Sequence, residues 1–309
     1  MKAKLVTGLF SAAIAVTAAA GATGHAEAAA TAPQCFAYLS AGSPNLIVNH
    51  AAALESSPCA GISWVFPWKD LEPAAGSYDW TTVDDALAAS GTKPVFLRVI
   101  AGNVSPAWLP RADGIDAANP KGGTAWEPIP WNADFLASWK TFITAFGARY
   151  NANTQIVQIE GGGDGPQGEA NLAGTYAQWQ SVGYSEQTYV GAISTEIADF
   201  KSAFPNHKIS FAGASGPTGA PAQPSLLQGF LGACEQANIV VQNNGLTGTQ
   251  YGHINQSVIE FGYQTAGAQG TKLGSALELA SSLGASFVEV YYSDATNPAN
   301  YAAITSFQS

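Results

Sequence analysis

The sequence predicts a single (β/α)8 TIM barrel of the α/β class, and three observations lead to that prediction. Short runs of apolar, β-branched and aromatic residues recur eight times along the chain. They are apolar almost throughout, which is typical of parallel strands that are covered on both faces. Segments with apolar residues at helical spacing lie between them. Eight strands alternating with helices in about 280 residues is the content of such a barrel.

The predicted strands follow one another at fairly regular intervals. They are CFAYLSA from residue 35, GISWVFP from 61, KPVFLRVIA from 93, TQIVQIE from 154, HKISFAG from 207, ANIVVQN from 237, SVIEFGY from 257 and SFVEVYY from 286. The predicted helices are TTVDDALAASG from 81, NADFLASWKTFITAFGARY from 132, EQTYVGAISTEIADFKSAF from 186, SLLQGFLGACEQA from 225, KLGSALELASSLGA from 272 and NPANYAAITSF from 297. A doubly wound open sheet is the alternative. Against it, no glycine-rich phosphate turn follows the first strand and no Walker motif is present.

Residues 1–28 have the composition of a secretory signal peptide. Two lysines precede a long apolar stretch, and Ala-Glu-Ala at 26–28 forms a small-x-small cleavage site. A membrane anchor is the alternative, but Gly21 and Gly24 interrupt the apolar run before it reaches spanning length. We therefore expect a secreted, extracellular protein with no membrane association after cleavage, whose residues 29–309 form one barrel domain.

The composition indicates a neutral polar ligand. Acidic residues outnumber basic ones, 22 to 12, and the net charge of −10 disfavours nucleic acid, because no basic patch is available to release counterions. Charged residues make up only 11% of the chain, whereas Trp, Tyr and Phe number 8, 11 and 14. Such a surface suits an oligo- or polysaccharide.

The chain contains three cysteines, Cys35, Cys59 and Cys234. In an exported protein an oxidised pair is expected. Cys35 and Cys59 would flank the first strand and the first helix, so we predict that they form the disulfide and that Cys234 is a buried thiol. Their spacing matches no zinc pattern, and we expect neither a metal site nor a cofactor.

Two carboxylates are placed where a barrel enzyme would need them. The active site of this fold lies at the carboxyl-terminal ends of the strands. Glu169 follows the fourth predicted strand and Glu260 lies on the seventh. Hydrolysis of a glycosidic bond requires one carboxyl group that protonates the leaving oxygen and another that attacks the sugar or activates water. Glu160 and Asp164, in the same glycine-rich stretch as Glu169, are weaker alternatives for the acid.

A short segment carries a family resemblance. FPWKDLEPAAGSYDW at 66–80, with PAWL at 106–109, resembles the second-strand region of clan A glycoside hydrolases, notably the family 42 beta-galactosidases. The matching positions are Trp68, Leu71, Glu72, Pro73, Gly76, Tyr78 and Trp80. The resemblance implies that the acid/base is a glutamate after the fourth strand and that the nucleophile is a glutamate ending the seventh, a place that Glu260 fits. Glu72 is expected to be structural.

The fourth strand departs from that family pattern. Clan A enzymes have an Asn-Glu pair there, and this chain has none. GDGPQGEANL at 163–172 is similar instead to the GPxGE turn of beta-amylases, which implies that Glu169 is the acid. The distinctive clan A motifs cover only about residues 61 to 110.

Further side chains are expected to bind substrate or to orient the carboxylates. Arg98 lies inside the apolar run FLRVI, where a charge is costly to bury without a carboxylate partner. Together with Tyr263 and Asn243, it would keep the nucleophile ionised. Indole and phenol rings can stack on the apolar face of a pyranose. The aromatic residues expected to do so are Trp64, Trp68, Trp108, Trp126 and Tyr292.

The sequence thus predicts an exported glycoside hydrolase that acts on neutral glycans, with Glu169 as acid/base and Glu260 as nucleophile of a retaining mechanism. An inverting enzyme with the same two glutamates is one alternative, and the separation of the two carboxyl groups would distinguish it. A non-catalytic barrel that binds a glycan or another partner is a third hypothesis. It predicts that one of the two carboxylates points away from the cleft or is held in a salt bridge.

Overall fold

The structure, a computed structural model, describes residues 32–40, 44–118, 123–162, 170–250, 254 and 259–309. They lie in one compact unit that begins at Ala32. The predicted signal peptide lies outside the described residues. Among those that are described, no helix is both long and apolar enough to cross a membrane.

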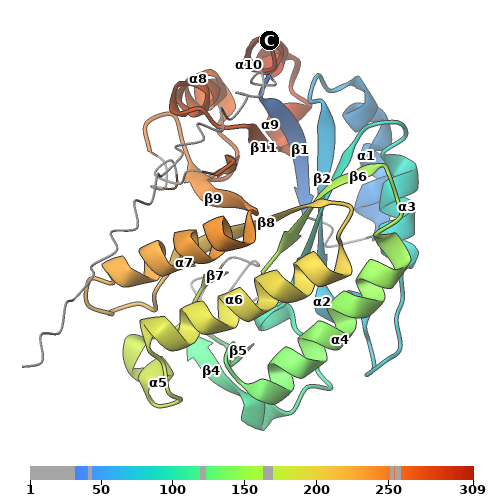
Figure 1. The fold of residues 1–309 in the computed structure, drawn as a ribbon. Helices are drawn as coiled ribbons and strands as arrows, with labels where there is room; N and C mark the ends of the chain where they lie inside the picture. The colour runs from blue at the N-terminus through green and yellow to red at the C-terminus, as the bar shows by residue number, and fades with distance from the viewer. Residues whose placement is uncertain (1–31, 41–43, 119–122, 163–169, 251–253, 255–258) are drawn as a thin grey trace, which may run out of the picture. The chain divides into compact units, whose positions relative to one another are not determined.

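Eight parallel strands close into a barrel, which confirms the predicted fold class and excludes an open sheet (Figure 1). Around the barrel they follow the order β1-β2-β3-β6-β8-β9-β10-β11, and β11 pairs with β1 to close it. Their bounds are β1 (Gln34–Ser40), β2 (Gly61–Pro67), β3 (Val95–Ile100), β6 (Ile156–Gly161), β8 (Lys208–Ser215), β9 (Val240–Leu246), β10 (Phe261–Thr265) and β11 (Phe287–Tyr291). A two-residue strand, β7 (Ala170–Asn171), also pairs with β8.

Helices cover the outside of the barrel (Figure 1). They are α1 (Pro44–Ser56), α2 (Trp68–Leu71), α3 (Thr81–Ala89), α4 (Ala133–Tyr150), α5 (Tyr176–Gln180), α6 (Glu186–Ala203), α7 (Pro224–Ala237), α8 (Leu273–Leu283), α9 (Tyr292–Ala295) and α10 (Tyr301–Phe307). Capping residues determine where two of these helices begin or end. The Asn132 side chain caps α4 by accepting from two backbone N–H groups, and α8 ends at Gly284, whose φ of 82° suits glycine.

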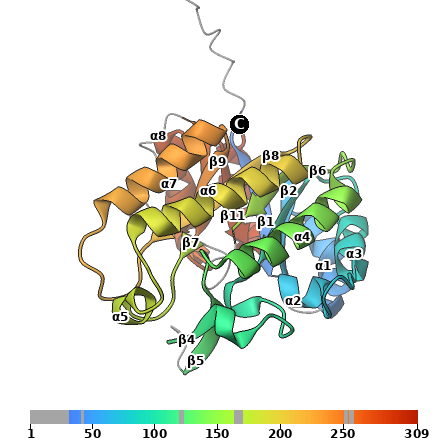
Figure 2. The ribbon, with the colours of Figure 1, turned by 60° about the horizontal axis from the view of Figure 1, so that its bottom comes forward.

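The segment between β3 and α4 contains a β-hairpin. Its antiparallel strands are β4 (Gly114–Ala118) and β5 (Thr124–Pro128), which pair apart from the barrel. Figure 2 shows the hairpin extending away from the barrel strands. Because it follows β3, it belongs to the end of the barrel where the strands finish.

Alternation along each strand decides which side chains face the barrel interior. On β2, Ser63 faces inward, while Trp64 packs against the helical layer. Towards the amino-terminal ends of the strands, the interior is filled by an apolar cluster of Phe36, Phe96, Val240 and Phe287. The three phenylalanine rings meet edge to face, with centroids 5.7 to 6.3 Å apart.

The cysteine predictions are confirmed. Cys35 and Cys59 form a disulfide, and Cys234 is a buried free thiol. Near the disulfide the Gln308 side chain, just beyond α10, accepts from the backbone N–H groups of Cys35 and Ala60 at 3.0 and 2.9 Å. The chain's last helix is therefore tied to its first two strands.

Candidate active site

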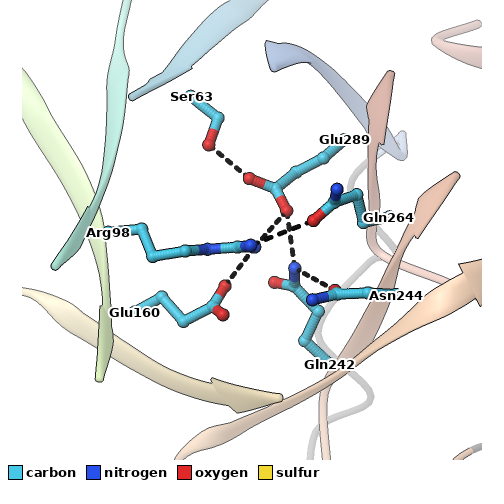
Figure 3. A network of polar contacts seen from close by, with 7 residues as sticks. All are labelled: Ser63, Arg98, Glu160, Gln242, Asn244, Gln264 and Glu289. Carbon is cyan, nitrogen blue, oxygen red and sulfur yellow. Dashed lines mark hydrogen bonds and ion pairs between the residues drawn. The ribbon is translucent and has the colours of Figure 1, made fainter. Parts of the chain in front are cut away.

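A buried cluster of charged and amide side chains lies inside the barrel (Figure 3). Its centre is Arg98 of β3. One guanidinium nitrogen, Nη2, lies 2.6 Å from Glu160 Oε2 and 2.5 Å from Glu289 Oε2. The other, Nη1, donates to Gln264 Oε1 at 3.0 Å. Arg98 is 1% exposed and both glutamates are 0% exposed, so this is a desolvated ion network and not a surface salt bridge.

Glu289 accepts hydrogen bonds from several members of this cluster. Besides the Arg98 contact, it accepts from the Ser63 hydroxyl and from Gln242 Nε2, the latter at 2.5 Å. Gln242 Nε2 also donates to Asn244 Oδ1 at 2.9 Å. Donors on three strands therefore surround one carboxylate, an arrangement that stabilises its negative charge.

Strand register brings these residues to one level of the barrel. Arg98 and Glu160 are partners across the β3–β6 pair, and Gln264 and Glu289 are partners across β10–β11. In-register residues of parallel neighbours point to the same face of the sheet, which here is the interior. Glu160 is the penultimate residue of β6, so the cluster reaches towards the carboxyl-terminal ends of the strands.

The two glutamates are close enough to act on one bond. Since both carboxylates contact the same nitrogen, the two contacting oxygens lie no more than about 5 Å apart. Carboxyl groups separated by about 5–5.5 Å are typical of retaining glycosidases, whereas inverting enzymes leave room for a water molecule between them.

Tyr38 of β1 borders the cluster. Its ring centroid lies 5.5 Å from Arg98 Cζ, and its ring packs at 5.0 Å from that of Tyr291. Burial raises the pKa of Tyr38 above its ordinary value, with smaller contributions from nearby charges. The phenol therefore stays protonated at neutral pH and can donate a hydrogen bond.

The structure corrects the position predicted for Glu260. Strand β10 begins at Phe261, so Glu260 precedes that strand instead of ending it. Both its carboxylate oxygens accept from Lys208 Nζ at 2.8 Å, and Lys208 begins β8. Both residues lie where parallel strands start, at the end of the barrel opposite the usual active site. The placement on which the predicted role of Glu260 as nucleophile depended is wrong.

The acids of the glycine-rich turn are placed only in part. Glu160 is described and belongs to the Arg98 cluster. Asp164 and Glu169 lie outside the described residues, so their roles stay predictions.

Three predicted substrate-binding side chains are core residues instead. Trp64 and Trp68 are each 0% exposed, and their indole N–H groups donate to Ser90 Oγ and Glu72 Oε2. Tyr263 is also 0% exposed; it lies on the outer face of β10, since its neighbour Gln264 points inward. A ring enclosed by protein on both faces has no surface left for a sugar.

Glu72 has the structural role expected of it. Its two carboxylate oxygens accept from the Trp68 indole N–H and from Gly76 N, at 2.7 and 2.8 Å. The segment 66–80, which carries the clan A resemblance, therefore stabilises the connection from β2 to α3.

The remaining predicted residues lie nearer the carboxyl-terminal ends of the strands. Half-buried Trp108 donates to the Glu72 carbonyl, and Trp126 of the β4–β5 hairpin donates to the Arg111 carbonyl. Tyr292, which begins α9, packs against His50 with ring centroids 4.1 Å apart. Asn243 lies on β9 between inward-facing Gln242 and Asn244, so it points away from the cluster and accepts from Gly245 N.

Sequence reasoning found Arg98 but missed Glu289. An arginine inside an apolar strand needs a carboxylate partner, and the structure supplies two for Arg98. Glu289, in the run SFVEVYY, shows the same signal. Within the described part of the chain, no three His, Cys, Asp or Glu residues gather in a way that could hold a metal ion.

No protein-family model and no curated protein matches the sequence. Among solved structures, the chain is similar to a beta-galactosidase from the psychrophilic Marinomonas ef1, with a TM-score of 0.52 and 10% sequence identity. The match covers 84% of this chain and 54% of that one, so the chain spans about half the length of that enzyme. At this identity the similarity concerns the fold alone: the chain is a closed (β/α)8 barrel of the architecture that this beta-galactosidase also contains.

Proposed function

We propose that the protein is a secreted glycoside hydrolase that cleaves O-glycosidic bonds of a neutral oligo- or polysaccharide with retention of configuration. The observation that carries the proposal is the pair of glutamates, Glu160 and Glu289, held on one guanidinium nitrogen inside the barrel. The Cys35–Cys59 disulfide supports secretion, because such bonds persist in oxidising compartments.

Glu289 is the nucleophile in this proposal. Ser63, Arg98 and Gln242 donate to its carboxylate and hold it in a fixed position for attack. Its attack on the anomeric carbon would form a glycosyl-enzyme, and the bond to the leaving oxygen would break as that oxygen is protonated.

The acid/base comes from the exit of β6. Glu160 lies within about 5 Å of Glu289 and occupies the strand after which the clan A resemblance implies the acid, but it would have to leave its ion pair with Arg98 to carry the proton. Glu169, in the GPxGE-like turn, is the other candidate and was the residue predicted from sequence. Arg98 lies between the glutamates, so the sugar would have to approach from the loop end of the barrel.

The compensated charge of Arg98 favours a neutral substrate. Its charge is compensated by two carboxylates, which leaves no net positive charge for a sugar acid at this level of the barrel. Trp108, Trp126 and Tyr292 are retained as candidates for stacking on sugar rings.

A second function, a non-catalytic glycan-binding barrel, is favoured by one observation. Of the two carboxylates predicted from sequence, Glu260 points away from the expected cleft and is held in an ion pair with Lys208. That is the outcome which the non-catalytic hypothesis predicted.

The two functions are distinguished by incubating the purified protein with a panel of aryl glycosides and neutral polysaccharides. We expect release of reducing sugar, with the first product having the anomeric configuration of the substrate by NMR. Binding of a polysaccharide in calorimetry, without cleavage of any panel member, would establish the non-catalytic function instead. Cleavage with inversion would retain hydrolase activity but contradict the roles given to Glu160 and Glu289.

A further inference from the structure

The barrel contains polar atoms that the Arg98 cluster does not use. Gln158 Nε2, Ser210 Oγ and Gln242 Oε1 are buried and have no hydrogen-bond partner among the described residues. Gln158 is 4% exposed, and the other two residues are 0% exposed. Buried polar groups in native proteins are almost always hydrogen-bonded, to protein or to ordered water.

Strand register places these three side chains on the same interior face. Ser210 of β8 is in register with Glu160 of β6, whose side chain faces inward, and Gln158 precedes Glu160 by two residues. Ser210 is also in register with Val240 of β9, and Gln242 follows Val240 by two residues. The three side chains therefore run diagonally across three adjacent strands, at spacings that long side chains can bridge.

Among the described residues, apolar side chains fill the amino-terminal part of the barrel interior. Phe36, Phe96 and Phe287, with Val240, fill that part of the interior with apolar rings and methyl groups. Glycine at two positions makes room for the rings: a Cβ at Gly262 would clash with Phe287, and one at Gly61 would lie 2.5 Å from Phe36. Gln158 is in register with Phe96 and Ser210 with Val240, so these two polar groups lie beside the apolar cluster, whereas Gln242 also contacts Glu289 of the Arg98 cluster.

We propose that Gln158, Ser210 and Gln242 form a binding site for internal water inside the barrel. The chemistry of the three atoms selects this ligand. Gln158 Nε2 donates, Gln242 Oε1 accepts, and the Ser210 hydroxyl does either. Water can satisfy such a mixed set, because it both donates and accepts and typically makes about three hydrogen bonds when buried. A metal cation would face the amide donor, and an anion would face the amide acceptor.

A crystal structure of the purified protein, at a resolution that shows ordered solvent, tests the proposal directly. We expect solvent density within hydrogen-bond distance of Gln158, Ser210 and Gln242. Direct protein–protein hydrogen bonds between these side chains, with no solvent density, would overturn it. So would an anomalous signal at the site after soaking with rubidium or bromide, since that would identify an ion.

A variant pair extends the test to solution. Ser210→Val removes the hydroxyl and adds bulk, so the solvent density should disappear and the oxygen-17 magnetic relaxation dispersion from long-lived internal water should fall. Ser194→Val is the matched control, because Ser194 is exposed on α6 and its hydroxyl bonds only to the Val190 carbonyl within the helix. An equal dispersion signal in both variants would contradict the site. If Ser210→Val fails to fold, the wild-type crystal structure still decides.

Discussion

Arg98 Nη2 lies 2.5 Å from Glu289 Oε2, and both side chains are enclosed in the barrel. Replacing Arg98 by methionine keeps an apolar stem of similar length but leaves Glu160 and Glu289 buried without their shared cation. Breaking a buried ion pair by removing one partner costs about 3–5 kcal/mol. We expect the free energy of unfolding in urea to fall by about that amount.

The control for this variant is Arg111→Met. Arg111 contacts Asp116 at 2.5 Å, but their side chains are 68% and 61% exposed, so the pair contributes about 1 kcal/mol or less. Equal losses in the two variants would show that the Arg98 cluster is not desolvated as described.

Gln308 makes a stabilising contact far from the candidate site. Its amide accepts from Cys35 N and Ala60 N, and donates to the Pro58 carbonyl at 2.8 Å. Gln308→Ala leaves these groups without their partner; because two of the three bonds are only partly buried and the one from Ala60 N is exposed, we expect a loss of about 1 kcal/mol. We expect a lower melting temperature with unchanged hydrolysis of substrate at 25 °C. Ser309→Ala, which removes only an exposed bond to the Ser306 carbonyl, should leave the melting temperature as it is.

The stability that the buried Cys234 thiol contributes is expected to depend on pH. Burial, with a smaller effect of the Glu235 carboxylate, raises the pKa of the thiol from 9.0 to about 12. The folded protein thus holds the proton more tightly than the unfolded chain does. The stabilisation is fully present below about pH 9 and is lost as the pH rises towards 12.

Two measurements check this prediction. The difference in unfolding free energy between the wild type and Cys234→Ala should shrink as the pH is raised from 8 towards 11. At pH 8.5, iodoacetamide should leave the folded thiol unmodified and alkylate it in urea. Alkylation at the same rate in both states would mean that the thiol is accessible in the native protein.

The barrel could be predicted from sequence because its strands are apolar on both faces. Six of the eight predicted runs overlap closely with barrel strands; the run ANIVVQN from 237 begins three residues before β9, and the run SVIEFGY from 257 begins four residues before β10. In the second of these runs, the two apolar residues before Glu260 have the pattern of a strand start, but β10 begins at Phe261. The strand starts a few residues later than predicted, so Glu260 lies at its amino-terminal end and not at its carboxyl-terminal end.

The candidate site could be predicted only in part, for a related reason. Hydrophobicity shows that a strand is buried but not which of its residues point into the barrel, because a shift by one residue exchanges the two faces. The sequence therefore predicts Trp64 as a stacking ring and Tyr263 as a partner of the nucleophile, although both face the helices. Charged residues such as Arg98 and Glu289 are more informative, because a charged side chain in an apolar barrel strand has to pair with another buried group.

The hydrolysis rate of Glu289→Gln, compared with that of Glu260→Gln, tests the central claim most directly. Both substitutions replace one carboxylate oxygen by an amide nitrogen, but they do so at opposite ends of the barrel. On the best substrate of the panel, we expect Glu289→Gln to lose at least about a thousandfold in kcat, because nucleophile and transition-state interactions are lost together. Glu260→Gln should keep nearly the wild-type rate, since its pair with Lys208 is partly exposed. Full activity in Glu289→Gln, or its loss in Glu260→Gln alone, would contradict the account.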